Sequence, residues 1–303
     1  MLMQAVDTYL AVRRTVGFAL VTIEPYLRHF ARFATARGDT HVVTTTAIDW
    51  ASLAPSEAQR HYRLQVVVRF ARFMRAEDPQ HQIPPVGLFR GRRERPIPYI
   101  FSDDEIEQLL REARRLGPPG TLRPHTYRTL FGLLAVTGMR ISEARALHLK
   151  DLTADGLVIR QAKFRKSRLL PLHETTRAPL EYYLDHRQHV AGADPHLFVT
   201  RRHGNLSYTL VNQTFRPALK AAGIPREPGR RRPRLIDLRH TFAVRCLEQA
   251  PETRDHIGRH TLALTTYMGH TTISSTFWYL ERTPQLMVDI AQACEAFIYG
   301  ETL

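Results

Sequence analysis

The chain has 303 residues, enough for two domains, and 43% of them are hydrophobic, which suffices for ordinary buried cores. Lysine and arginine number 43 against 29 aspartates and glutamates, which gives a formal net charge of +14. An excess of this size predicts a polyanionic partner, most simply nucleic acid, although a merely basic protein would also show it. No apolar run approaches the roughly 20 residues that span a bilayer, which argues against a membrane protein.

The cysteines and the first residues indicate the compartment. Only Cys246 and Cys294 occur, and neither belongs to a CxxC or Cys/His cluster, which argues against a disulfide framework and a structural zinc site. The N-terminal residues lack the basic-then-apolar order of a secretory signal. We therefore expect a cytoplasmic protein in a reducing environment. Because no carboxylate cluster of the kind that holds Mg²⁺ stands out, the sequence predicts no metal and no cofactor.

Residues 1–83 predict a helical domain. Apolar side chains recur at helical spacing over residues 23–37, and Gly38 is the predicted C-terminal cap. A second helix is predicted over residues 56–76, with several arginines largely off its apolar side. For that arginine face alone, a solvated surface is the simpler interpretation.

A basic linker is predicted over residues 84–98. Five prolines and a group of arginines between residues 78 and 98 argue against a helix there. Because guanidinium groups pair with phosphate oxygens, such a linker can lie along a DNA backbone, or it can be a plain solvated connection. A second basic loop covers residues 226–234. The arginines predicted to contact DNA are Arg90, Arg92, Arg93 and Arg95 in the linker and Arg230, Arg231, Arg232 and Arg234 in the loop.

Residues 99–303 predict a second, larger domain. Residues 102–105 form a capping box, and a strongly apolar helix over residues 125–136 ends at Thr137 and Gly138. Two β-type runs, residues 156–161 and 168–172, flank the segment AKFRKS and predict a hairpin. Further helices are predicted over residues 176–189, after Ser207, from residue 235 and over residues 284–297. The predicted fold class is therefore mainly α with a small β-hairpin or sheet (α+β).

Four separated motifs contain residues suited to phosphodiester chemistry. They are TGMRISEA around Arg140, the hairpin lysines in AKFRKS, DLRHTFA around Arg239, and MGH, whose His270 precedes Tyr279 by nine positions. Each is weak alone, because a lone arginine is usually salt-bridged at the surface and a hairpin lysine is usually solvated. An isolated histidine and tyrosine are also most often ordinary core residues.

In this order, the four motifs resemble those of the tyrosine recombinase (phage integrase) family, in particular its Xer-like site-specific integrases. The resemblance covers most of the chain and implies an N-terminal helical core-type DNA-binding domain, a basic linker and a catalytic domain. It implies that Arg140 and Arg239 bind a DNA phosphate and that Tyr279 attacks it to form a 3′-phosphotyrosyl intermediate, with no metal or ATP. His270 is then a phosphate ligand or proton shuttle. Alignment on the shared Arg-x-x-Pro-Leu ending places the general-acid lysine at Lys163.

The resemblance also implies partners and leaves alternatives open. The expected partner is a double-stranded recombination site, bound by a dimer per site and a homo-tetramer on two duplexes. The helix over residues 284–297 would dock on the next protomer, or it would pack on its own domain. The competing functions are a catalytically impaired DNA-binding member of the same fold and a type IB topoisomerase.

Beside the four motifs, the chain has one further acidic residue that fits the resemblance and two departures from it. Glu143 follows Arg140 by three residues, and the resemblance implies that it orients this arginine, a surface ion pair being the alternative. Where the family commonly has a histidine or lysine, three residues before Arg239, this chain has Ile236. We expect His240 or the loop over residues 230–234 to compensate in part. His270 follows His240 by 30 positions, a long connection whose excess we predict to be a polar surface loop over residues 249–260.

Overall fold

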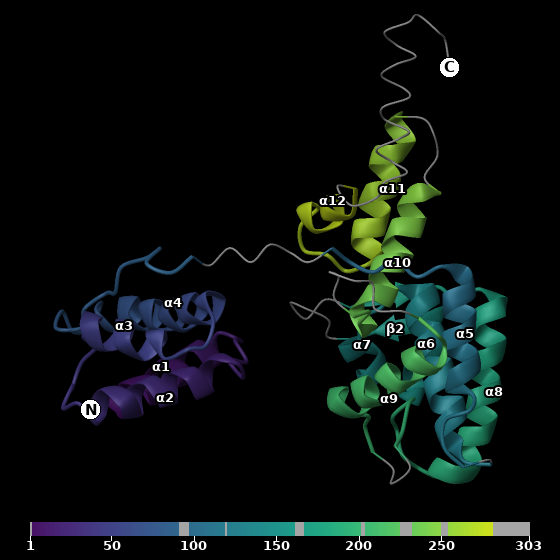
Figure 1. The fold of residues 1–303 in the computed structure, drawn as a ribbon, viewed down its shortest axis with the longest axis horizontal. Coiled ribbons are helices and arrows are strands. Elements are labelled where there is room, and N and C mark those ends of the chain that lie inside the picture. Colours follow the sequence, from purple (N-terminus) through teal and green to yellow (C-terminus); the bar gives the residue numbers. More distant parts are fainter. Residues whose placement is uncertain are drawn as a thin grey trace, which may run out of the picture. The chain divides into compact units, whose positions relative to one another are not determined.

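The computed structural model describes residues 2–280, except 91–96, 119, 161–166, 201–203, 225–231 and 250–253. The chain forms two compact units, Met1–Arg95 and Pro96–Leu303 (Figure 1). Each unit has its own buried apolar cluster and is described by itself.

The N-terminal unit is a four-helix domain. Its helices are α1 (Leu2–Thr15), α2 (Ile23–Thr35), α3 (Thr44–Ser52) and α4 (Glu57–Met74). The apolar spacing of α2 buries Leu27, Phe30 and Ala34 against the other helices, with Trp50 of α3 fully buried. The helix predicted over residues 56–76 begins where Ser56 accepts a hydrogen bond from the backbone N–H of Gln59.

The second unit is built around one buried helix, α6 (Leu122–Thr137), which packs against α5 (Asp103–Ala113), α8 (Glu174–Ala191) and α10 (Leu235–Glu248) (Figure 1). Leu130, Phe131 and Leu134 of α6 are buried in the main apolar cluster of the unit. The unit also contains α7 (Ile141–Ala146), a 3₁₀ turn at Leu149–Asp151 and α9 (Tyr208–Ala221). At the end of α6, Gly138 adopts the left-handed conformation with φ of +58°.

A small antiparallel sheet lies against this helical unit. Its strands, β1 (Leu152–Thr153), β2 (Gly156–Ile159) and β3 (Arg168–Leu170), are arranged in the order β1-β2-β3. Leu157 pairs with Leu170 across the predicted hairpin, so both point into the core. The mainly helical chain with a small sheet confirms the predicted fold class, and β1 is a strand that the sequence did not predict.

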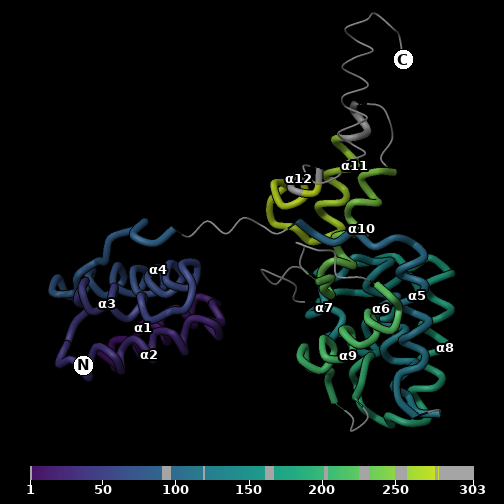
Figure 2. Tube along the Cα trace, in the orientation of Figure 1, coloured from purple at the N-terminus to yellow at the C-terminus, as the bar shows by residue number. Residues whose placement is uncertain are grey.

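The last three described helices form a separate apolar cluster. In it α10 packs against α11 (Arg254–Tyr267) and α12 (Ser274–Leu280), as Figure 2 shows. The prediction of a polar surface loop over residues 249–260 is wrong, because α11 already begins at Arg254. Thr261, Leu264 and Thr265 are buried on one side of that helix, and Met268, directly after its end, continues the spacing of three to four residues. The polar composition of the segment hid this pattern.

Several predictions fall outside the described residues. They concern the helix over residues 284–297, Lys163, and the arginines Arg92, Arg93, Arg95, Arg230 and Arg231. Among the helices that the structure describes, none is both long and apolar enough to cross a membrane.

Candidate active site

Arg140 lies at the start of α7, where the chain turns out of the buried helix α6. Its backbone is extended, so it caps α7 instead of lying within it, and Glu143 occupies the third helical position. The carboxylate of Glu143 accepts hydrogen bonds from the Arg140 backbone N–H (2.9 Å) and from Nη1 of its side chain (2.8 Å). Nη2 of Arg140 donates to the carbonyl oxygen of Gly269 at 3.0 Å, which ties the start of α7 to the segment before α12.

Glu143 is also clamped by a second arginine, Arg168 at the start of β3. The two Nη atoms of Arg168 lie 2.7 and 3.1 Å from the two carboxylate oxygens, and its Nε donates to the carbonyl oxygen of Tyr267. The Glu143 side chain is only 6% exposed, so the surface ion pair considered as an alternative is wrong. Burial would raise the pKa of Glu143, but the hydrogen bonds from Arg168 and Arg140 lower it to about 2.

The backbone between α11 and α12 has to pass close to both arginines. Gly269 has φ of +64°, and a Cβ there would lie 2.8 Å from Nη1 of Arg168 and 3.5 Å from Nη1 of Arg140. A Cβ at this position would therefore displace the guanidinium group of Arg168, and the positive φ would itself be strained for a residue with a side chain. Glycine at position 269 permits the backbone to approach both arginines this closely.

Arg239 reaches the same place from α10 and is 4% exposed. Its Nη1 donates to the carbonyl oxygen of Gly138 (2.6 Å), and its Nη2 donates to that of Met268 (2.7 Å) and lies 3.0 Å from Nε2 of His270. Burial and the positive charge of Arg140 lower the pKa of Arg239 to about 10, so the group remains charged at neutral pH. Arg140, Arg168 and Arg239 together outnumber the single carboxylate of Glu143, which leaves the site cationic.

Tyr279 lies on α12 beside two histidines. Its side chain is 3% exposed and packs in the apolar cluster of α10–α12. Its hydroxyl lies 3.1 Å from Nδ1 of His240, and its ring stacks with that of His270 at a centroid distance of 6.2 Å. Tyr279 is thus a buried aromatic residue, as expected for an ordinary core tyrosine. Its hydroxyl is also in contact with a candidate base, His240.

Both histidines of the site are held neutral. Burial, together with the neighbouring arginines, lowers the pKa of His240 and that of His270 to about 4. For His240 the negative charge of Asp237, whose Oδ1 lies 4.0 Å from Nε2, opposes this shift without overcoming it. At neutral pH each ring therefore keeps one nitrogen lone pair.

Ile236 lies on α10 four residues before His240, so the two share a face of that helix. The isoleucine is half-buried and has no polar group to offer. The imidazole that contacts the tyrosine hydroxyl comes instead from His240, one helical turn further along.

The predicted DNA-contacting arginines that can be located differ in their surroundings. Arg90 and Arg232 are exposed. Arg234 is engaged with Asp237, whose carboxylate accepts from its backbone N–H and from its Nε and Nη2, so its charge is partly neutralised at the start of α10.

Two residues of the site were missed from the sequence. Arg168 is the first residue of the Arg-x-x-Pro-Leu run, which served only to align the hairpin lysine. Thr276 is fully buried, and its hydroxyl lies 2.8 Å from Nδ1 of His270. Its only signal was the abundance of threonine and serine between His270 and Tyr279, which did not single it out.

One group in the described part of the chain has the composition of a metal site. Donor atoms of His41, Asp78 and His81, in the N-terminal unit, lie within 4.8 Å of one another. However, the backbone N–H of Val42 donates to Nδ1 of His81 (3.1 Å), so the ring hydrogen is on Nε2, the nitrogen that a metal would need. The 2.9 Å contact between His41 and Asp78 completes a hydrogen-bonded cluster that needs no ion.

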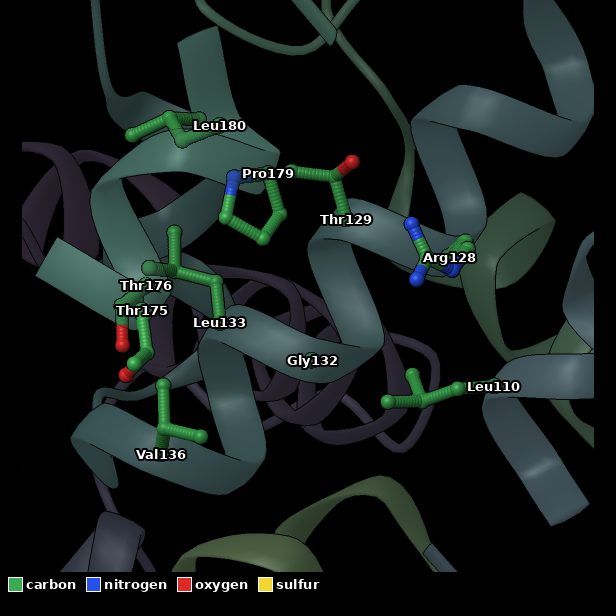
Figure 3. Close-up of a pocket in the computed structure, with 10 residues that line it drawn as sticks. All are labelled: Leu110, Arg128, Thr129, Gly132, Leu133, Val136, Thr175, Thr176, Pro179 and Leu180. Atoms are coloured by element: carbon green, nitrogen blue, oxygen red, sulfur yellow. The ribbon is translucent and has the colours of Figure 1, made fainter. Parts of the chain in front are cut away.

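An apolar hollow lies elsewhere in the second unit. Figure 3 shows it between Leu110 of α5, the stretch of α6 from Arg128 to Val136, and the first turns of α8 around Pro179. It shares no residue with the cationic site. The apolar hollow and the cationic site are therefore separate features of this unit.

The sequence matches the profile of the phage integrase family over residues 100–285. It is 40% identical over 303 residues to y4rB of Sinorhizobium fredii, whose name describes it as an integrase/recombinase, with 96% of each chain covered. It is 31% identical over 246 residues to the tyrosine recombinase XerD of Caulobacter vibrioides, covering 79% of this chain and 75% of the other. The chain therefore belongs to the phage integrase family of tyrosine recombinases, which is a class of enzymes. Its family and its fold support a function in site-specific recombination.

Solved structures share the fold. The XerH site-specific recombinase bound to its difH substrate matches with a TM-score of 0.63 and 19% identity, over 90% of this chain and 79% of that one. The lambda integrase tetramer bound to a Holliday junction matches with a TM-score of 0.64 and 19% identity, over 91% of this chain and 76% of the other.

Proposed function

We propose that the chain recombines DNA by cleaving one strand with Tyr279 and holding the broken 3′ end as a phosphotyrosyl ester. The observation that carries this proposal is convergence: Arg140, Arg239, His270 and Tyr279 come from separate segments and share one cluster of contacts. A cationic site with a tyrosine hydroxyl and neutral histidines suits attack on an anionic phosphodiester.

The two arginines of the proposal would share the phosphate unequally. A guanidinium has five N–H donors, and two of those on Arg140 have partners among the described residues, while its side chain is 26% exposed. Arg239 is buried and engaged with two carbonyl oxygens and His270. We assign the first contact with a non-bridging oxygen to Arg140, while Arg239 would stabilise the charge that develops in the transition state.

His240 is the proposed base. It is neutral, and its Nδ1 faces the hydroxyl of Tyr279, so it can accept the phenolic proton as the Oη–phosphorus bond forms. The P–O5′ bond breaks in the same step, and the departing 5′ oxygen takes a proton, which we assign to Lys163 as the resemblance implies. Attack of another 5′-hydroxyl on the phosphotyrosine reverses these steps and reseals the strand, with no need of an external energy source.

Roles of the N-terminal unit and of assembly are part of the same proposal. We assign the helical unit and the basic linker to the far side of a double-stranded site, where phosphate contacts would make binding strongly salt-dependent. A dimer on each site and a tetramer on two duplexes would bring the four strands together. Deleting residues 284–303 and measuring synapsis separates exchange of the C-terminal segment between protomers from packing on its own domain.

The test is covalent capture on a nicked duplex. A binding site is first selected from the DNA on either side of the gene, and a nick is then placed so that the cleaved 5′ fragment diffuses away. The wild-type chain should form a covalent protein–DNA adduct, and Tyr279→Phe should bind equally well without forming one. Tight specific binding with no adduct from the wild type would instead favour a catalytically impaired DNA-binding protein.

A further inference from the structure

His270 is fixed from both sides of its ring. Nε2 lies 3.0 Å from Nη2 of Arg239, and Nδ1 lies 2.8 Å from Oγ1 of Thr276. An arginine has only donors, so Nε2 must accept and must carry a lone pair. In the neutral ring the hydrogen is then on Nδ1, which donates to Thr276.

The hydroxyl oxygen of Thr276 accepts from a second side as well. Oγ1 of Thr265, on α11, donates to it at 2.9 Å and also lies 2.7 Å from the carbonyl oxygen of Thr261. A hydroxyl oxygen has two lone pairs, so Thr276 can accept from His270 and from Thr265 at once. In this order, Thr265 holds in place the oxygen to which Nδ1–H of His270 donates.

Burial makes this order costly to break. Thr276 is 0% exposed and Thr265 is 6% exposed, so water has little access to either hydroxyl. A ring N–H left without an acceptor in such a place is unfavourable, because it loses its hydrogen bond to water and gains none in the protein. The chain of hydroxyls therefore restricts both the tautomer of His270 and the rotation of its ring.

We propose that Thr276, backed by Thr265, is a positioning residue that holds His270 as the Nδ1–H tautomer with the Nε2 lone pair directed at Arg239 and the phosphate site. The proposal rests on the proposed function for its catalytic meaning. His270 would then enter the reaction as a neutral ring whose Nε2 accepts a hydrogen bond from Arg239, instead of as a permanently charged phosphate ligand. The charged and titratable groups that face it are Arg239, Arg140, Arg168, His240 and the stacked ring of Tyr279.

The structural part is tested without DNA. In the full chain labelled with ¹⁵N-histidine, the two ring nitrogens of His270, assigned by loss of their signals in His270→Gln, report the tautomer directly. Wild type and Thr276→Ser should show one Nδ1–H form, and Thr276→Val should lose this single form and give a mixed or shifted pair. An unchanged Nδ1–H form in Thr276→Val would overturn the proposal, because Arg239 alone would then set the ring. Circular dichroism confirms that each variant is folded.

The catalytic part is tested by adduct formation under single-turnover conditions. Thr276→Val should slow cleavage about 10-fold at saturating DNA while leaving DNA affinity within about twofold. A displaced His270 would no longer orient Arg239, and a small misplacement in an active site can cost up to about 10²-fold in rate. Thr276→Ser should restore the rate. Thr266→Val, which removes an exposed hydroxyl bonded to Leu262 on the same helix, is the matched control. A normal rate in Thr276→Val despite a changed tautomer would overturn the catalytic part. Absence of any adduct from the wild type would overturn the proposed function and leave the tautomer result standing.

Discussion

The buried ion pair between Arg168 and Glu143 should be worth a measurable share of the stability of the second unit. The fall in the pKa of Glu143 from 4.5 to about 2 corresponds to about 3 kcal/mol in favour of the charged carboxylate. Of the interactions that lower this pKa, the hydrogen bonds from Arg168 are the largest, ahead of the backbone N–H and side chain of Arg140. We therefore expect Arg168→Met, which keeps the stem and removes the charge, to lower the free energy of unfolding by about 2–3 kcal/mol.

Urea unfolding near pH 7, followed by circular dichroism, measures this loss. Arg111→Met is the matched control, because Arg111 pairs with Glu107 on an exposed helical face and should cost no more than about 0.5 kcal/mol. The double variant with Glu143→Gln completes a thermodynamic cycle, whose coupling energy should be about 2 kcal/mol. Because the folded pKa of Glu143 is depressed, the coupling is present above its unfolded value of 4.5 and is lost as pH falls toward about 2. A change within about 0.5 kcal/mol for Arg168→Met, or a coupling near zero, would show that the pair is only a crowded contact.

Three further predictions follow from the same site. His240→Ala should slow adduct formation about 10²-fold or more, and Ile236→His in that background should restore part of the rate; an unaltered rate in His240→Ala, with Ile236→His alone much faster than wild type, would contradict the assignment of the base. Lowering the pH from about 7 to about 5 should lower the free energy of unfolding by about 1–2 kcal/mol for each of His240 and His270, because the unfolded rings bind protons in this range and the folded rings, with pKa about 4, do not. In urea unfolding, His240→Gln should lose correspondingly less stability over the same pH range. A loss equal to that of the wild type would refute this origin. Gly138→Ala should lower Tm by several degrees, because its φ is +58° and its Cβ would overlap the ring of Phe242; a Tm unchanged in a calorimetric scan would mean that the ring can move away.

Local features were predictable because their signals lie in adjacent residues. The capping box of Ser102 and Glu105 forms as predicted, with both reciprocal hydrogen bonds. Gly138 ends α6 in the left-handed conformation, and the two β-type runs around residues 161–166 pair as an antiparallel hairpin. In each case a few neighbouring side chains determine the backbone, so no distant contact is required.

Tertiary packing overrides composition in the segment that begins α11. Its polar composition predicts a loop, yet the helix is held by one buried side and by Nε2 of His260, which lies 2.6 Å from the carbonyl oxygen of Cys246. The polar composition of residues 249–260 says nothing about α10 and α12, on which the buried side packs. The partner surface, and not local propensity, makes that segment helical.

By itself, the sequence determined the fold class and the family, because the motif order around Arg140, Arg239 and Tyr279 is a property of the chain as written. Only the tertiary structure decided which atoms meet. It placed Arg168 on Glu143, His240 on the hydroxyl of Tyr279, and Thr276 behind His270. The physical reason is that these contacts join segments far apart along the chain, and their distances depend on how α10, α11 and α12 pack together. No periodicity or spacing in the sequence encodes such a distance, so the contacts among these groups are visible only in the folded chain.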